Sequence, residues 1–153
     1  MSASRFIGGI VEITDAGGAV VEPGWLAKSE RVHRQLRPHM PADYRAKMER
    51  VFADGARMTV AVADGEVAGV AVYRRYEDTA TGIKFYVDDL VTDETWRSRG
   101  VGQALIAYLD DAARDAGGDC LVLDSGAQRQ QAHKFYFREG FVITSFNFKK
   151  RLK

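Results

Sequence analysis

The sequence contains too little cysteine for a disulfide-stabilised fold. Cys120 is the single cysteine in 153 residues, so neither an internal disulfide nor a thiolate metal cluster can form. This excludes a secreted disulfide scaffold and a structural zinc module, and a reducing, cytoplasmic setting is expected. The three histidines show no metal-ligand spacing, so we expect no metal and interpret them as solvated or hydrogen-bonded structural residues. They are His33, His39 and His133.

Charge of one sign and long apolar runs are also missing. Lys plus Arg total 22 against 21 Asp plus Glu, for a net charge of +1, so the whole chain has no electrostatic preference for nucleic acid or an anionic membrane. No stretch approaches the roughly 18 apolar residues of a membrane span, and the N-terminus lacks the pattern of a signal peptide. We therefore expect no nucleic-acid partner and no membrane partner. Any basic site must be local.

Proline is scarce and confined to the first third of the chain, and the rest runs without a linker. Hydrophobic periodicity and turn residues predict the order of elements. These are a strand at 6–14, helices at 25–36 and 42–52, a hairpin of strands at 58–63 and 67–73, a strand at 83–92, a helix from 101, a strand at 120–124, a helix at 128–139 and a last strand at 141–149. The early strands form antiparallel pairs, and the strand–helix–strand unit over 83–124 makes parallel neighbours. The predicted class is α/β (α+β) with a mixed sheet.

The most specific local pattern lies between the strand at 83–92 and the helix from 101. It consists of Arg97, Ser98, Arg99, Gly100, Val101 and Gly102. A strand-to-helix turn with two glycines lets backbone N–H groups approach an anion, and the helix N-terminus adds partial positive charge. The flanking arginines favour a diphosphate ligand. The alternative is that the glycines only permit a tight turn and close packing.

Two known phosphate motifs fit this turn poorly. A P-loop needs Lys followed by Ser or Thr after its last glycine, but Gln103 and Ala104 stand there. A Rossmann fingerprint needs a third glycine, and Leu105 occupies that position, although Asp124 does end the next strand. Dinucleotide binding is kept as a secondary alternative.

Two segments together resemble the acetyl-CoA site of the GNAT superfamily of N-acetyltransferases. The first spans residues 88–102 and contains Arg-x-x-Gly-x-Gly, and the second, at 132–141, reads Ala-x-x-x-Tyr-x-x-x-Gly-Phe. The resemblance extends from about residue 58 to about residue 148. It implies a GNAT-like sheet with an antiparallel N-terminal part, a splayed parallel strand pair and helices on both faces. It also implies one acetyltransferase domain over 1–153, with the acceptor side at 1–55 and the acetyl-CoA core at 56–153.

The same resemblance implies acetyl-CoA as co-substrate and direct transfer of its acetyl group to a primary amine in a ternary complex. The pantetheine arm would pair with backbone groups of Leu90, Val91 and Thr92, while N–H groups over 97–102 would hold the pyrophosphate. Arg129 stands where many members have an asparagine. An arginine cannot accept a hydrogen bond but can reach a phosphate, so the local contact must differ.

Tyr136 matches the family tyrosine that protonates the departing CoA thiolate. Its spacing from Ala132 and Phe135 equally fits a core-facing helix surface. Both interpretations predict that the ring lies against apolar neighbours, and only the first gives the hydroxyl a catalytic role.

Asp88 stands where related diamine acetyltransferases carry a glutamate base, which implies that it draws a proton from the amine through water. The alternative is a strand-end carboxylate paired with Arg74, Arg75 or Lys84. Alternation along the strand predicts that Asp88 and Asp89 point to opposite faces, so that at most one faces the acceptor. A carboxylate there would also attract a cationic acceptor.

We expect the acceptor to be a small-molecule amine. The two N-terminal helices, together with Glu12, Asp15 and Glu77, are expected to wall its pocket, and Phe137 is the candidate contact of a homodimer. Two alternatives stay open, namely an acetyltransferase acting on a protein amino group and a non-catalytic acyl-CoA-binding regulatory module.

Overall fold

A long antiparallel hairpin forms the centre of the structure, a computed structural model that describes residues 5–153. It joins β2 (Ala56–Ala63) to β3 (Glu66–Asp78) through Asp64 and Gly65, whose φ angles are 52° and 75°. Positive φ at both central residues matches the natural twist of a two-residue hairpin, and Asp-Gly is the pair that adopts it most readily. The predicted turn is therefore confirmed.

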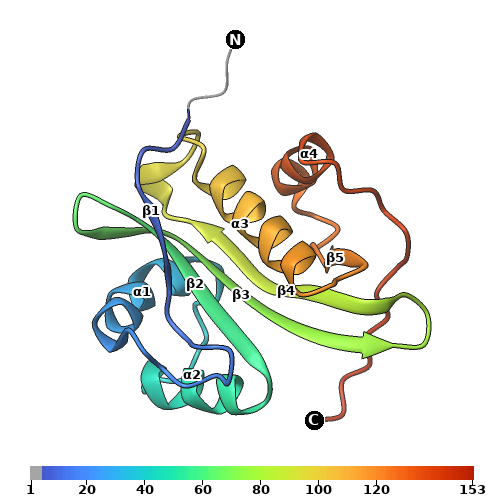
Figure 1. Cartoon of the computed structure of the whole chain (residues 1–153), viewed down its shortest axis with the longest axis horizontal. Helices are drawn as coiled ribbons and strands as arrows, with labels where there is room; N and C mark the ends of the chain where they lie inside the picture. Colours follow the sequence, from blue (N-terminus) through green and yellow to red (C-terminus); the bar gives the residue numbers. More distant parts are fainter. Residues whose placement is uncertain (1–4) are drawn as a thin grey trace. The chain divides into compact units, whose positions relative to one another are not determined.

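The other elements follow the predicted order (Figure 1). They are β1 (Gly9–Glu12), α1 (Pro23–Leu36), α2 (Tyr44–Ala53), β4 (Gly82–Thr92), the short 3-10 helix η1 (Glu94–Trp96), α3 (Val101–Asp115), β5 (Cys120–Leu123) and α4 (Gln130–Arg138). The sheet runs β1-β2-β3-β4-β5, antiparallel as far as β4 and with β5 as the parallel neighbour of β4. This confirms the predicted mixed sheet.

Helices α1 and α2 cover one face of the sheet. Alternate residues of β2 and β3, among them Met58, Val60 and Val72, are buried against Leu26 and Met48 of these helices. Period-two alternation on the strands and helical spacing on α1 bring these apolar side chains to one layer.

Helix α3 covers the opposite face. A Cβ atom added at Gly69 of β3 would lie 2.6 Å from Cγ1 of Val101 and 3.0 Å from Cδ1 of Leu105. Only glycine lets α3 approach β3 this closely. Helices on both faces, as predicted, are thereby confirmed.

Residues up to Val122 form one compact unit, and Leu123–Lys153 form a second. In the second unit, α4 covers most of the helix predicted at 128–139 and ends one residue earlier, at Arg138. The predicted strand at 141–149 is wrong because that segment has no regular secondary structure. Apart from Phe141, its apolar side chains are exposed, Phe148 by 94%. Apolar alternation produces a strand only where a neighbouring strand takes up the backbone hydrogen bonds, and within residues 5–153 none does so for this segment.

No helix among residues 5–153 combines the length and the apolar character needed to cross a lipid bilayer.

Candidate functional site

The turn between β4 and α3 presents backbone donors. Gly100 precedes the first helical residue with a left-handed backbone (φ 79°), and no side chain caps the helix. The first bond of the helix runs from the Ala104 N–H to the Gly100 carbonyl at 3.0 Å. The N–H groups of Val101, Gly102 and Gln103 therefore lie ahead of the helical hydrogen-bond ladder and point out of the helix start. This is the geometry expected for an anion site.

Two arginines flank these donors. Arg97 and Arg99 are exposed, and the Arg99 guanidinium lies 5.2 Å from the centre of the Trp96 ring. Ser98 has a left-handed backbone with φ 61°, which is unusual for a residue other than glycine. The turn thus brings positive side chains and free N–H groups to one segment, as the sequence predicted.

Asp93 anchors this turn to α1, and sequence analysis missed it. Its carboxylate is 1% exposed and accepts hydrogen bonds from Arg31 (2.9 Å), Gln35 (2.9 Å) and Thr95 (3.0 Å). The Arg31 hydrogen bond is the main reason that the pKa of Asp93 lies well below its usual range, and Gln35 and Thr95 add to the effect. An Asp ending an apolar strand was visible in the sequence, but its partners on α1 were not.

Backbone groups at the end of β4 face away from β3. The Asp93 N–H donates to the Ala68 carbonyl at 2.9 Å, and Val91 lies opposite Val70. Because the bonding direction alternates along an antiparallel strand, Leu90 and Thr92 present their N–H and carbonyl groups at the other edge. These are two of the three residues predicted to contact the pantetheine arm.

A β-bulge changes the direction of the two aspartates on β4. Val72 pairs with Asp89 and Tyr73 with Val87, so Asp88 is an extra residue without an opposite partner. A bulge disturbs the strict alternation of side chains. Asp88 and Asp89 consequently line the same cavity, and the prediction that they point to opposite faces is wrong.

Each of these carboxylates is paired with an arginine. Asp88 Oδ2 accepts hydrogen bonds from Arg74 Nη2 at 2.6 Å and Arg74 Nε at 2.9 Å. Asp89 Oδ1 lies 2.6 Å from Arg37 Nη2. The pairing that sequence analysis held as the alternative for Asp88 is therefore present, with Arg74 as the partner.

Asp89 continues into a buried chain of hydrogen bonds. His33, 1% exposed, lies 2.7 Å from Asp89 Oδ2 through Nε2 and 2.9 Å from the Tyr44 hydroxyl through Nδ1. An ionised carboxylate can only accept, so Nε2 carries the hydrogen in this arrangement. Burial alone would raise the pKa of Asp89, but His33 and Arg37 outweigh it and lower the pKa. His33 is thus a hydrogen-bonded residue, one of the two states expected for it.

The cavity that contains both aspartates has a volume of about 520 Å³ and is walled by α1, α2 and the loop between them. The two helices predicted to wall the acceptor pocket therefore both line this cavity. Glu12, Asp15 and Glu77, which were expected beside them, do not line it. Glu12 accepts a hydrogen bond from the Tyr108 hydroxyl, Asp15 accepts from two N–H groups of its own turn, and Glu77 pairs with Ile83 along the β3–β4 hairpin.

Tyr136 and Arg129 belong to the second unit. Tyr136 is 9% exposed, and its ring meets those of Phe135 and Phe141 edge to face. Burial raises the pKa of its hydroxyl, with a smaller opposing effect from Arg129. Arg129 is the residue before the first turn of α4, and its side chain makes no hydrogen bond or ion pair within residues 5–153.

The model of the acetyltransferase (GNAT) family matches residues 25–141, a range that includes the cavity, the β4–α3 turn and Tyr136. The chain belongs to this family. The predicted resemblance is confirmed.

Curated relatives match this member of the family over part of their length. The uncharacterized N-acetyltransferase YhdJ of Bacillus subtilis is 44% identical over 70 residues, which cover 45% of this chain and 49% of the relative. The aminoalkylphosphonate N-acetyltransferase of Salmonella typhimurium is 30% identical over 94 residues, 61% of each chain. The chain therefore spans between about half and three-fifths of these relatives.

Solved structures show the same fold. An aminoglycoside N-acetyltransferase, AAC(6′)-Iy, in complex with CoA superposes with a TM-score of 0.80 over 95% of this chain and 94% of that chain. The two sequences are 22% identical, so the likeness concerns the fold.

Proposed function

We propose that this protein transfers the acetyl group of acetyl-CoA directly to a primary amine of a small molecule, in a ternary complex. One observation carries the proposal. Along β4, the cavity aspartates at 88–89 are followed at once by the outward-facing backbone of Leu90 and Thr92, and then by the donor-rich turn before α3. A single strand thus orders the groups needed for the amine, the thioester arm and the diphosphate.

The first unit supplies most of the acetyl-CoA contacts in this proposal. Leu90 and Thr92, with Val91 between them, bind the pantetheine arm through backbone groups where β4 and β5 splay apart. The N–H groups of the turn hold the pyrophosphate, and the side chains of Arg97 and Arg99 add charge. Arg129 of the second unit contributes a further cation toward phosphate.

The proposed chemistry needs one base and one acid. Asp88 takes a proton from the bound ammonium through water, and the neutral amine then attacks the thioester carbonyl. The new C–N bond forms and the nitrogen releases its second proton to solvent. The C–S bond breaks, and the Tyr136 hydroxyl donates its proton to the departing thiolate and is then reprotonated from solvent. A phenol keeps its proton at neutral pH, as this proton donor must.

Small amines are the acceptors named for relatives and structural neighbours, an aminoalkylphosphonate in one and an aminoglycoside in another. They support a small-molecule amine for this chain as well. We further propose that residues 1–153 act as one acetyltransferase domain, that the protein works in the cytoplasm, and that exposed Phe137 contributes to a homodimer contact.

The decisive experiment measures CoA release with a panel of primary amines for the parent protein and for Tyr136→Phe. We expect turnover with at least one amine, and a fall in kcat of about 10²-fold or more for the variant with unchanged acetyl-CoA binding. Intact acetyl-CoA binding without turnover on any amine, small or peptidic, would instead identify a regulatory acyl-CoA-binding module.

A further inference from the structure

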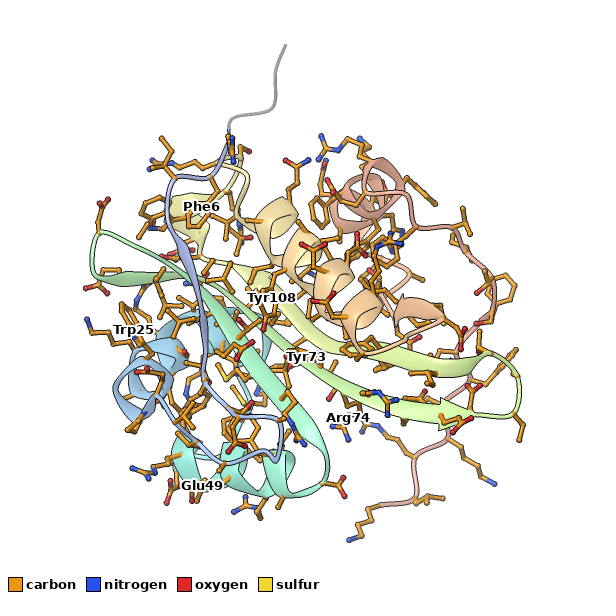
Figure 2. All side chains as sticks on the ribbon, viewed as in Figure 1. Phe6, Trp25, Glu49, Tyr73, Arg74 and Tyr108 are labelled. Carbon is orange, nitrogen blue, oxygen red and sulfur yellow. The ribbon has the colours of Figure 1, made fainter. Side chains whose placement is uncertain are left out.

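The carboxylates of the cavity are already neutralised by the protein itself. Arg74 binds Asp88 through two nitrogens, and Arg37 lies 2.6 Å from Asp89, which also accepts from His33. Figure 2 shows Arg74 beside β3, the strand to which it belongs. A carboxylate held by a guanidinium attracts a further cation far less than a free one. The pairs therefore weaken the cavity as a receptor for a polycationic amine.

One cation of the cavity has no such partner. Lys47 projects from α2 into the cavity, is half-buried, and its ammonium makes no hydrogen bond or ion pair within the described chain. Arg37, Lys47 and Arg74 stand against Asp88 and Asp89, so the arginine, lysine and aspartate side chains of the cavity wall carry a net charge of +1. An unpaired, partly desolvated ammonium is stabilised by an anion that enters beside it.

We propose that the acceptor is a primary amine that carries an anionic group, a phosphonate or a carboxylate, a few bonds from its nitrogen, and that Lys47 binds this group. The inference rests on the proposed acetyl transfer and adds the chemical class of the acceptor. It reverses the expectation from sequence that a lone carboxylate draws in a cationic acceptor. The apolar side chains of Leu36, Met40 and Val51 in the same wall fit the short carbon chain between the two groups.

A matched series of acceptors tests the preference. 2-Aminoethylphosphonate, ethanolamine and ethylenediamine share the aminoethyl group and differ in the charge at the other end. We expect kcat/KM to be highest for the phosphonate, about tenfold or more above ethanolamine, and lowest for ethylenediamine, because one charge-assisted contact has this magnitude. β-Alanine, with a carboxylate in place of the phosphonate, separates the two kinds of anion.

Lys47→Met tests the residue. The variant keeps a long apolar side chain, so we expect KM for 2-aminoethylphosphonate to rise about tenfold while KM values for ethanolamine and acetyl-CoA stay unchanged. The matched control is Arg45→Met. Arg45 lies on the same helix but pairs with Glu49 on the exposed side, at 2.8 Å, where Figure 2 shows Glu49 at the edge of the molecule. This control should leave all three constants as they are.

A second measurement is independent of turnover. Ethylphosphonate, which lacks the amine, should bind the parent protein and raise its Tm, and Lys47→Met should abolish the shift. If no amine is acetylated yet ethylphosphonate binds through Lys47, the proposed function fails and the anion site stands. If ethanolamine or ethylenediamine is acetylated better than both anionic amines, the anion preference is overturned and the acetyltransferase remains.

Discussion

The two proposed binding regions next to β4 are built in opposite ways. The proposed diphosphate site in the β4–α3 turn consists of the backbone of a few consecutive residues, with left-handed Gly100 just before α3. The cavity beside Asp88 and Asp89 gathers side chains from α1, α2, β3 and β4, and its longest link, from His33 to Asp89, joins residues 56 positions apart. A site made from contiguous backbone is visible as a motif, whereas a site made from distant side chains exists only after folding.

This difference has consequences for substitution. In the turn we expect the largest loss where the backbone needs glycine, because the N–H donors are main-chain groups. In the cavity both aspartates are paired, Asp88 with Arg74 and Asp89 with Arg37 and His33. The loss of one member of such a pair leaves its partner without compensation in a low-dielectric surrounding. Substitutions in the two regions test this contrast.

Asp88→Asn should lower turnover about 10²-fold, since an amide cannot accept the proton of the ammonium. The ratio of parent to variant rates should be greatest at low pH, where the amine is hardest to deprotonate. Initial rates of CoA release from pH 6 to 9 give this ratio. A ratio independent of pH would remove Asp88 from the mechanism and leave it as the partner of Arg74 only.

Asp89→Ala should lower the free energy of unfolding by about 2–3 kcal/mol, because it leaves buried His33 without its acceptor. Asp88→Ala is the matched comparison and should cost about 1 kcal/mol or less, as its pair with Arg74 is more accessible to solvent. Urea unfolding of both variants measures the difference. Equal losses of unfolding free energy in the two variants would contradict the contrast between the buried contact of Asp89 with His33 and the partly exposed pair of Asp88 with Arg74.

Gly100→Val should weaken CoA binding about tenfold, since a branched side chain at the start of α3 blocks the approach of an anion. The left-handed backbone adds a loss of stability of about 1–2 kcal/mol, which the sequence alone did not predict. Calorimetric titration with CoA and thermal unfolding report the two effects separately. Gly100→Asn, which tolerates this backbone, should recover most of the stability, and unchanged CoA affinity in Gly100→Val would refute the anion site.

The pairing of Asp93 should make the free energy of unfolding fall at low pH. We expect this effect to be smaller than those of the variants above. Its folded pKa is lowered, so the stabilisation is present above the unfolded carboxyl pKa near 4 and is lost as pH falls through the lower folded value. Urea unfolding between pH 7 and pH 3 should show a steeper loss for the parent than for Asp93→Asn. Parallel pH curves would mean that Arg31 contributes no net stabilisation through this carboxylate.

Most of the fold was predictable because its signals are local. Asp64-Gly65 specifies its hairpin turn through backbone preferences, and Gly100 marks the start of α3 for the same reason. The segment at 141–149 shows the limit of such signals, since its apolar alternation is that of a strand but within residues 5–153 no neighbour pairs with it. Local residue preferences favour an extended conformation, but a strand forms only where a neighbouring strand accepts and donates its backbone hydrogen bonds.

The candidate site likewise has features that the sequence predicts and features that only the folded structure reveals. The amino-acid sequence by itself determined the acetyltransferase family, the donor-rich turn and the presence of two adjacent aspartates, because these depend on residues next to one another in the chain. Tertiary structure alone decided that a bulge turns both aspartates into one cavity, that Arg74, Arg37 and His33 neutralise them, and that Lys47 is left without a partner. The physical reason is that electrostatic balance is a property of distances between side chains, and packing sets those distances for residues that the sequence separates.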